Sequence, residues 1–268
     1  MNKHIRFIVI IVLTAVICIS GYQLWKMSER YVHEARVKES LLKYRLSEIL
    51  TDPAIPAAEF KEDGVFNIQA KPTETIINQF VINMQNEINT DIIGWLTVPD
   101  TKIDYPFVTA LDNDYYLRRD VFGNHALSGT LYMDYRCSKD FSGFNSIIYG
   151  HNMKNGSMFG ELNLFGEKSF FDENKYGTVF LKDHTYTLEF FAYIIVKSND
   201  EMIYDPCISS ENQDGYFEYI KNNARNYREP SKTDQQIKIA TLSTCLNSSG
   251  SNDKRIVLLA VINETEKR

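Results

Sequence analysis

The sequence predicts a mainly β fold, either a barrel or a sandwich, that follows an N-terminal apolar segment and two helices. Eight short β-prone runs separated by turn residues follow Gly94, in a stretch of about 175 residues. A single helical pattern interrupts them, between the sixth and the seventh run. The chain of 268 residues is 44% hydrophobic and 24% charged, which is ordinary for a globular domain and rules out a disordered chain.

Charge and cysteine content exclude several classes of function. The chain has 29 Lys and Arg against 35 Asp and Glu, a net charge of −6, and no dense basic block. A nucleic-acid-binding protein needs a basic face for phosphate contacts, so we expect no nucleic-acid partner. The cysteines are irregularly spaced and include no Cys-x-x-Cys pair, so we expect no disulfide framework, no metal site and no cofactor. They are Cys18, Cys137, Cys207 and Cys245.

Residues 7–25 predict a transmembrane anchor. This run of nineteen apolar or uncharged residues would span roughly 28 Å as a helix, close to the apolar thickness of a bilayer. Lys3 and Arg6 precede it, so the positive-inside rule places residues 1–6 in the cytoplasm and everything after residue 25 outside. A cleaved signal peptide is the alternative, but Ile17 and Ile19 replace the small residues that its cleavage site needs, so we favour an uncleaved anchor.

Residues 26–90 predict a helical membrane-proximal region with a linker. A broken apolar stripe indicates a helix from Lys26 to Leu50, and the Pro- and Gly-containing stretch 51–71 reads as a linker. Pro72 and Thr73 are typical of a helix start, and apolar residues then recur at steps of three and four as far as Ile92. We therefore expect a second helix immediately before the β domain.

Residues 91–268 predict the β domain. Its alternating and β-branched runs predict strands at Trp95–Val98, Tyr105–Val108, Thr130–Asp134, Ser146–Tyr149, Thr178–Leu181, Tyr186–Val196, Ile237–Ser243 and Arg255–Ile262. Between the sixth run and the seventh, Ser209 or Ser210 is a candidate N-cap for a helix that continues to about Tyr227.

Three residues at strand ends could carry chemistry. Cys245 ends an apolar run and precedes a polar loop, a place where a thiol is held rigidly and can still be reached. His151 follows another apolar run and Gly150, and its imidazole could act as general acid and base. Arg255 opens the last strand, ten positions after Cys245, so a hairpin would bring its guanidinium near the sulfur. Taken singly, each is more often a packing or surface residue.

Together, these residues resemble the signature of the sortase family. Thr241-Leu-Ser-Thr-Cys245 with Arg255 downstream and Tyr149-Gly-His151 about ninety residues upstream are similar to the family's site motifs, and Gly129-Thr-Leu-Tyr-Met-Asp-Tyr-Arg136 most resembles class B. The resemblance covers roughly residues 91–268. It implies a closed eight-stranded β-barrel with helices before it and one helix between late strands.

The resemblance also implies roles for individual residues. Cys245 would be the nucleophile, His151 the general acid and base, and Arg255 the group that stabilises the oxyanion or the substrate. Four further residues would line the peptide groove: Ser243, Asn113, Leu117 and, as a weaker candidate, Tyr204. The thiolate would cleave a Thr–Gly-like bond in the C-terminal sorting signal of a surface protein, and an amine of a peptidoglycan peptide would take up the acyl group. The localisation implied is a single-pass cell-membrane protein with an extracellular catalytic domain.

Three other functions remain open. An L,D-transpeptidase would carry Ser-x-Gly before its Cys and Arg after it, whereas Cys245 lies between Thr244 and Leu246. A pilin-polymerising sortase usually has an Asp-Pro-aromatic lid and a second membrane span, but Asp52-Pro53 is followed by Ala54 and the sequence ends in polar residues. The alternative without catalysis is an anchored β domain that only binds a partner.

Overall fold

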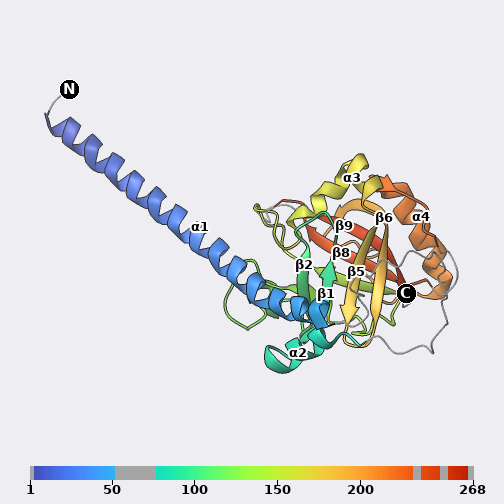
Figure 1. Ribbon diagram of the computed structural model, residues 1–268. Coiled ribbons are helices and arrows are strands. Elements are labelled where there is room, and N and C mark those ends of the chain that lie inside the picture. The colour runs from blue at the N-terminus through green and yellow to red at the C-terminus, as the bar shows by residue number, and fades with distance from the viewer. Residues whose placement is uncertain (1–2, 52–76, 232–236, 248–252, 265–268) are drawn as a thin grey trace, which may run out of the picture. The chain divides into compact units, whose positions relative to one another are not determined.

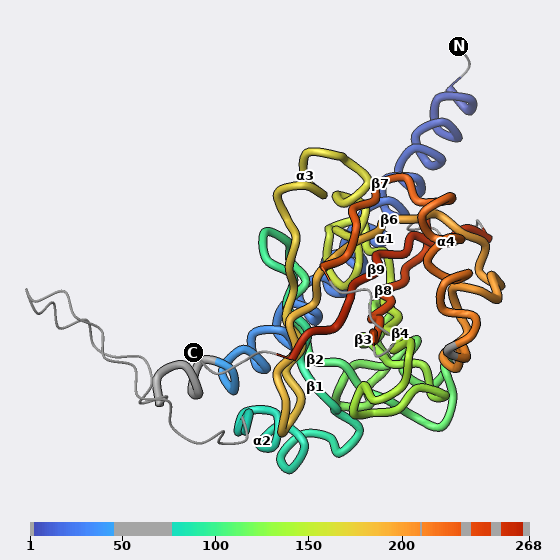
Figure 2. Tube along the Cα trace, turned by 90° about the vertical axis from the view of Figure 1, so that its right-hand side faces the viewer, coloured from blue at the N-terminus to red at the C-terminus, as the bar shows by residue number. Residues whose placement is uncertain are grey.

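The computed structural model describes residues 3–51, 77–231, 237–247 and 253–264. The chain forms two compact units, residues 1–42 and 43–268, and the boundary between them falls within helix α1 (Lys3–Thr51). The second unit contains the β structure (Figures 1 and 2). The linker expected at 51–71 and the helix start expected at Pro72 and Thr73 lie outside the described residues. The exception is Thr51, which is the last residue of α1.

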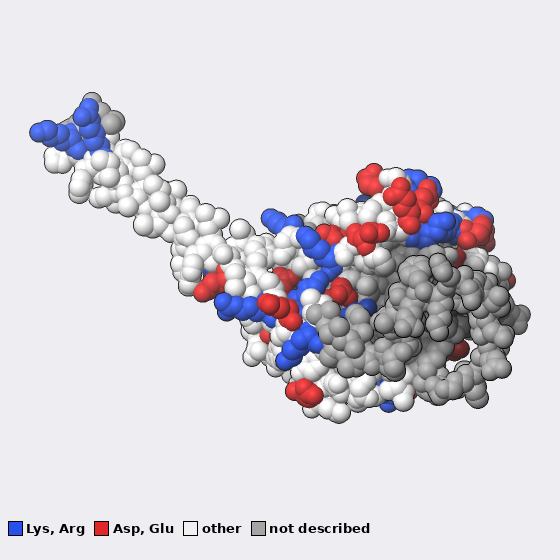
Figure 3. Space-filling view, in the orientation of Figure 1, with Lys and Arg blue, Asp and Glu red and all other residues white. Residues whose placement is uncertain are grey.

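Helix α1 merges the predicted anchor and the predicted helix 26–50 into one helix. Its most apolar stretch has a mean hydropathy of 2.4, and among the described residues it is the one helix long and apolar enough to cross a membrane. Uncharged side chains cover the part that follows its basic N-terminal tip (Figure 3). A helix of this length and composition is compatible with a single-pass membrane anchor.

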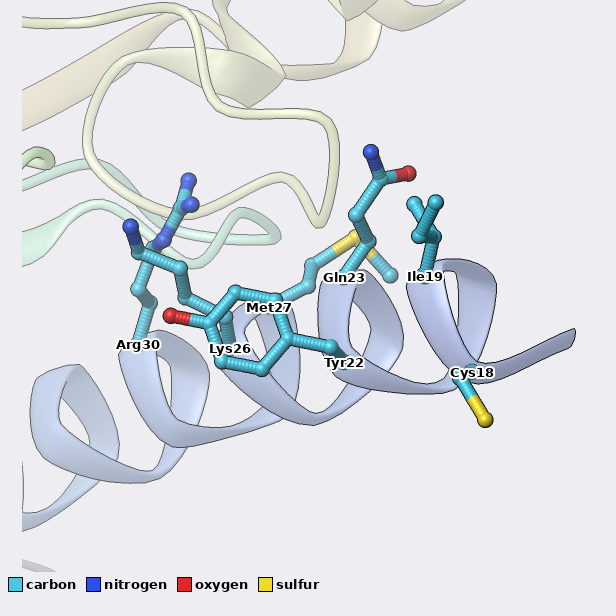
Figure 4. Close-up of a pocket in the computed structure, with 7 residues that line it drawn as sticks. All are labelled: Cys18, Ile19, Tyr22, Gln23, Lys26, Met27 and Arg30. Atoms are coloured by element: carbon cyan, nitrogen blue, oxygen red, sulfur yellow. The ribbon is translucent and has the colours of Figure 1, made fainter. Parts of the chain in front are cut away.

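A hollow beside α1 involves this helix alone. Its seven lining side chains run from Cys18 to Arg30 and project from successive turns of α1 (Figure 4). None of the residues singled out by the sequence for chemistry lines it, and its one cysteine, Cys18, belongs to the apolar segment. We therefore place the functional site elsewhere, in the β unit.

Eight strands close into a barrel. Neighbouring strands pair in the order β5-β1-β2-β3-β4-β8-β9-β6, and a further pairing of β6 with β5 closes the ring. Closure excludes the sandwich and confirms the barrel. The strands are β1 (Ile92–Thr97), β2 (Asp104–Val108), β3 (Leu131–Met133), β4 (Asn145–Tyr149), β5 (Tyr176–Leu181), β6 (Thr185–Lys197), β8 (Ile239–Cys245) and β9 (Lys254–Glu264). All eight coincide with predicted runs to within three residues at either end.

The long strands are apolar on both faces because both faces are buried. In β9, Ile256, Leu258 and Ala260 belong to the core inside the barrel. The alternating residues Val257 and Leu259 belong to a second apolar cluster, which includes side chains of helix α4 (Gln213–Asn223). Since side chains alternate along a strand, even-numbered positions of β8 and β9 point inward and odd-numbered positions point outward. This alternation decides where the site residues lie.

The late helix differs from the prediction at both ends. A 3-10 turn, η3 (Ser210–Asn212), precedes α4, and Asn212 rather than Ser209 or Ser210 occupies the N-cap position. The helix ends at Asn223, because Asn226 and Tyr227 pair with β6 as the short strand β7 (Asn226–Tyr227). The Asn226 side chain also donates to Phe165 O at 2.8 Å. These partners are distant in sequence, so local helix signals could not reveal the early stop.

Shorter helices cover the barrel's ends and connections. Helix α2 (Gln79–Glu87) packs Phe80 against Trp95 of β1 and lies at one end of the barrel (Figure 1). Asn78, at the N-cap of α2, is held by the β5–β6 turn: its backbone N–H donates to Lys182 O and its side chain donates to His184 O. The helix ends at Glu87. Ile92, which the sequence placed at the end of the helical pattern, is the first residue of β1. The remaining pieces are η1 (Tyr115–Arg118), η2 (Gly160–Gly166) and α3 (Lys168–Glu173).

Candidate active site

Strand register brings Cys245, His151 and Arg255 to one edge of the barrel. β4 and β8 are parallel and pair Tyr149 with Ser243. His151 and Cys245 each lie two positions beyond these partners. Because the two strands are parallel neighbours, the two residues lie at the same end of the pair. β9 runs antiparallel to β8 and pairs Arg255 directly with Cys245. The strands β4, β8 and β9 lie next to one another in Figure 2.

The same three residues share the outer face of the barrel. Cys245 and Arg255 are odd-numbered positions of β8 and β9, which point outward by the alternation described above. On β4, Ile148 belongs to the interior core, so Tyr149 points outward and His151 continues on that side. All three side chains are half-buried. A thiol, an imidazole and a guanidinium therefore lie at neighbouring strand ends on one face of the barrel.

Two hydrogen bonds join the His151 segment to the Cys245 strand. The backbone N–H of Gly150 donates to Ser243 O at 3.1 Å, and the side chain of Asn152 donates to Cys245 O at 2.8 Å. A Cβ on Gly150 would lie 2.4 Å from Leu131 Cδ2 and 2.8 Å from the Phe159 ring, so this position has no room for a side chain. The glycine before His151 thus lets the chain pass close over the core.

The His151 ring is oriented by a backbone carbonyl. Its Nε2 lies 2.7 Å from Leu117 O. A carbonyl oxygen only accepts, so Nε2 carries a proton and Nδ1 is the nitrogen that remains to exchange one. Leu117 was expected in the peptide groove. The side chain of Leu117 is half-buried, and its backbone carbonyl contacts His151, a role that the sequence did not reveal.

Three tyrosines, which we call the tyrosine cluster (Tyr132, Tyr149 and Tyr204), lie next to Cys245. The Tyr149 ring stacks on that of Tyr204 at 6.1 Å and approaches that of Tyr132 at 5.4 Å. The Tyr204 hydroxyl is 2.8 Å from Ser243 Oγ. The structure therefore brings the predicted groove residues Tyr204 and Ser243 into direct contact, two positions before the thiol.

The cluster's hydroxyls stay protonated. Burial raises the pKa of Tyr204 to about 12, and burial also raises the pKa values of Tyr132 and Tyr149 above the ordinary value. Tyr132 and Tyr204 both interact electrostatically with Cys245 and Arg255. Neutral phenols thus lie near the thiol on this side of the site. Sequence reasoning assigned no role to Tyr132 or Tyr149, although both stand in the quoted motifs.

Asn113, the remaining predicted groove residue, is linked to the cluster through Asp134. Its side-chain N–H donates to Asp134 Oδ2 at 3.1 Å, and its Oδ1 accepts from the backbone N–H of Tyr135 at 3.1 Å. The Tyr149 hydroxyl donates to the same Oδ2 at 3.0 Å. Asn113 and Tyr149 therefore share one carboxylate oxygen as their acceptor. Nothing local in the sequence pointed to this role of Asp134.

A polar groove of about 710 Å³ opens beside the segments that follow Cys245 and His151. Asn152 and Met153 beyond the histidine and Leu246 and Asn247 beyond the cysteine form one part of its wall. Charged residues form another part: Lys102, Lys154 and Glu161. The polar groove thus borders the residues after Cys245 and His151, whereas the tyrosine cluster includes Tyr149, which precedes His151, and contacts Ser243, which precedes Cys245.

The other cysteines lie on other segments than the end of β8 that carries Cys245. All four cysteines are free thiols, and Cys137 is half-buried with its sulfur against Asn145 O and the N–H of Ile147. Burial raises the pKa of the Cys137 thiol to about 11. In the part of the chain that the structure describes, no cluster of His, Cys, Asp and Glu could hold a metal ion.

Comparisons with known proteins agree on one family. A family profile described as "Sortase domain" matches residues 96–263. Sortase B of Listeria monocytogenes is 33% identical over 172 residues, which cover 64% of this chain and 70% of the relative. A solved Streptococcus pyogenes class B sortase involved in pilus biogenesis is 33% identical, with a TM-score of 0.62 and coverage of 68% of this chain and 97% of that one. The Staphylococcus aureus sortase B–substrate complex has the same fold, with a TM-score of 0.72 at 21% identity over 87% of this chain and 97% of that one.

Proposed function

Because this chain belongs to the sortase family of cysteine transpeptidases and its relatives are class B sortases, we propose that it attaches surface proteins to the cell wall. It cleaves a Thr–Gly-like bond in a C-terminal sorting signal and joins the new acyl end to an amine of a peptidoglycan peptide. The observation that carries this proposal is the strand register, which aligns Cys245 with both His151 and Arg255 on one outer edge.

The first half of the reaction forms a thioester. The Cys245 thiolate attacks the scissile carbonyl, and a bond forms between Sγ and the acyl carbon. The planar guanidinium of Arg255, paired across from Cys245 in the strand register, stabilises the charge that develops on the carbonyl oxygen. When the C–N bond breaks, His151 gives a proton to the departing amine.

The second half transfers the acyl group. His151 removes a proton from the incoming amine, the amine nitrogen attacks the thioester, and the S–C bond breaks to restore the thiolate. The two sides of the site suit two different substrates. The tyrosine cluster with Asn113 and Ser243 offers aromatic rings and neutral donors to the sorting peptide. The polar groove beyond Asn152 and Leu246 leaves space for the acceptor.

The anchor fits this activity. The uncharged part of α1 follows Lys3 and Arg6, so the positive-inside rule leaves the N-terminus in the cytoplasm and places the barrel outside. Sorting signals and the cell wall both lie on that side of the membrane. The orientation is part of the proposal.

A transfer assay tests the function. The protein is incubated with a library of sorting peptides, with and without an amine acceptor, and the products are read by mass spectrometry. We expect cleavage in the absence of acceptor and an additional amide product in its presence. Cys245→Ala should lose both, whereas Cys207→Ala, which removes an exposed thiol outside the site, should keep both. Cleavage by Cys245→Ala at the wild-type rate would refute the proposal.

Pilin polymerisation is a second candidate function. It is favoured by the 33% identity with a class B sortase whose description names pilus biogenesis. The chemistry is the same, but the acceptor is a lysine side chain of another surface protein. Offering a wall-type peptide amine and a pilin lysine peptide in the same reaction separates the two functions, since the preferred acceptor gives the larger share of amide product.

A further inference from the structure

Asp134 is a fully buried carboxylate to which the proposed chemistry assigns no step. It follows β3, and its side chain is 0% exposed. Oδ1 accepts from the backbone N–H and the Nε of Arg136 at 3.0 and 2.9 Å. Oδ2 accepts from Arg136 Nη2 at 2.8 Å, from the Tyr149 hydroxyl at 3.0 Å and from the Asn113 side chain at 3.1 Å. Both oxygens are therefore used, and each of the three partners comes from a different segment.

Arg136 connects this network to Tyr204, another member of the tyrosine cluster. Besides its bonds to Asp134, Arg136 Nη2 donates to Tyr204 O at 3.0 Å. The Tyr204 ring stacks on the Tyr149 ring with an interplanar angle of 28°. Tyr204 lies in the connection after β6, Tyr149 at the end of β4 and Asn113 before η1. One carboxylate thus links three parts of the chain that are far apart in sequence.

The charge of Asp134 decides which group donates in each of these hydrogen bonds. Burial raises the pKa of Asp134, but the hydrogen bonds from Arg136 and Tyr149 outweigh burial and leave that pKa below its ordinary value. An ionised carboxylate only accepts hydrogen bonds, so the Tyr149 hydroxyl and the Asn113 N–H must both point at it. The Asn113 carbonyl, which accepts from the N–H of Tyr135, is then fixed as well.

We propose that Asp134 is a positioning residue for the sorting peptide: it holds Tyr149 and Asn113 directly, and Tyr204 through Arg136, in the arrangement that receives the peptide. It does not touch the peptide or the reacting atoms. The inference rests on the proposed function and deepens it, because it identifies what orders the peptide-binding side of the site. Side chains that are ordered before binding lose less rotational freedom when the peptide arrives.

This role predicts a specific kinetic pattern. The network orders groups that bind the peptide equally before and during the reaction, so its loss raises KM much more than it lowers kcat. Small thiol reagents do not use the tyrosine cluster, so their reaction with Cys245 does not depend on Asp134. A residue that merely kept the barrel folded would change the kinetics of peptide cleavage and the reactivity of the Cys245 thiol together.

The experiment compares Asp134→Asn with Asp172→Asn in the full-length protein. Asn keeps the size of Asp, but it is neutral and an NH2 group replaces one of the two oxygens, so the hydrogen bonds that this oxygen accepts are lost. We expect KM for a cleaved sorting peptide to rise on the order of tenfold with kcat within about threefold, and the iodoacetamide reaction at Cys245 to keep its wild-type rate. Asp172→Asn removes an exposed carboxylate paired with Lys168 on α3 and should change neither. An unchanged KM, or an alkylation rate that falls with kcat/KM, would overturn the proposal.

Tyr149→Phe provides a milder second test. It removes the one hydroxyl that donates to Asp134 and keeps the ring, so it leaves the core intact even if Asp134→Asn does not fold. We expect KM to rise here too, and the two changes to be non-additive in a double-mutant cycle, because both break the same contact. A KM at the wild-type value would contradict the proposal by itself. A wild-type protein that cleaves no sorting peptide would instead refute the proposed function.

Discussion

At the scale of single residues, the thiols differ because their surroundings differ. Cys245 lies at the end of β8, beside a groove, whereas the sulfur of Cys137 lies against Asn145 O and burial raises its pKa to about 11. The thiolate is the reactive form, and at pH 8 a thiol with such a pKa is ionised to about one part in a thousand. The position of a cysteine in the barrel therefore decides its reactivity.

Thiol labelling should follow this difference. In folded protein treated with iodoacetamide at pH 8, we expect Cys245 and the exposed Cys207 to be alkylated well before Cys137. Because the pKa of Cys137 is raised, its labelling should increase steeply with pH and still be rising at pH 10. Peptide mapping by mass spectrometry measures each site. Labelling of Cys137 as fast as that of Cys245 at pH 8 would contradict this account of burial.

Arg255 provides the second test at this scale. Lys at this position would keep the positive charge but lose the planar fork that faces the carbonyl oxygen. If Arg255 stabilises the transition state, Arg255→Lys should lower kcat by roughly 10²–10³ and change KM little. Steady-state kinetics on a sorting peptide, with thermal melting to confirm folding, measures this. A higher KM with unchanged kcat would instead give Arg255 a role in peptide binding alone.

At the scale of elements, the glycine before His151 determines how the β4 end crosses the core. A Cβ on Gly150 would collide with Leu131 and Phe159, so Gly150→Ala must displace either these side chains or the segment that carries His151. We expect this variant to lose about 1–3 kcal/mol of unfolding free energy and much of its activity. Gly215→Ala on α4 is the matched control, because nothing lies within 4 Å of its Cβ. It should be neutral or stabilising by about 0.5–1 kcal/mol. Denaturant unfolding that ranks the two variants in the opposite order would contradict the packing described here.

The sequence predicted elements better than it predicted contacts. The eight barrel strands were recognisable because each is a local run of β-prone residues, and the burial of both faces explains why β9 is apolar throughout. The short strand β7 and the early end of α4 were missed because they depend on pairing with β6. In the site, motifs indicated Cys245, His151 and Arg255, but the link between Asn113 and Tyr149 passes through Asp134, which becomes visible only in three dimensions.

At the scale of the whole molecule, the proposed activity depends on the side of the membrane that the barrel occupies. The second compact unit begins within α1, well beyond the apolar residues 7–25. We therefore expect residues 26–268 to be soluble and active on peptides without the anchor. In intact cells with the wall removed, added protease should degrade the barrel of the full-length protein. Complete protection would place the barrel in the cytoplasm and contradict the positive-inside orientation.

The most direct test of the central claim is the intact mass of the protein after reaction with a sorting peptide in the absence of an amine. We predict an adduct with the mass of the peptide's N-terminal fragment, located on Cys245 by fragmentation and released when an amine acceptor is added. The adduct should be absent from Cys245→Ala and present in Cys207→Ala. Peptide cleavage without any adduct on Cys245 in wild-type protein, together with equal cleavage by Cys245→Ala, would show that this thiol is not the nucleophile.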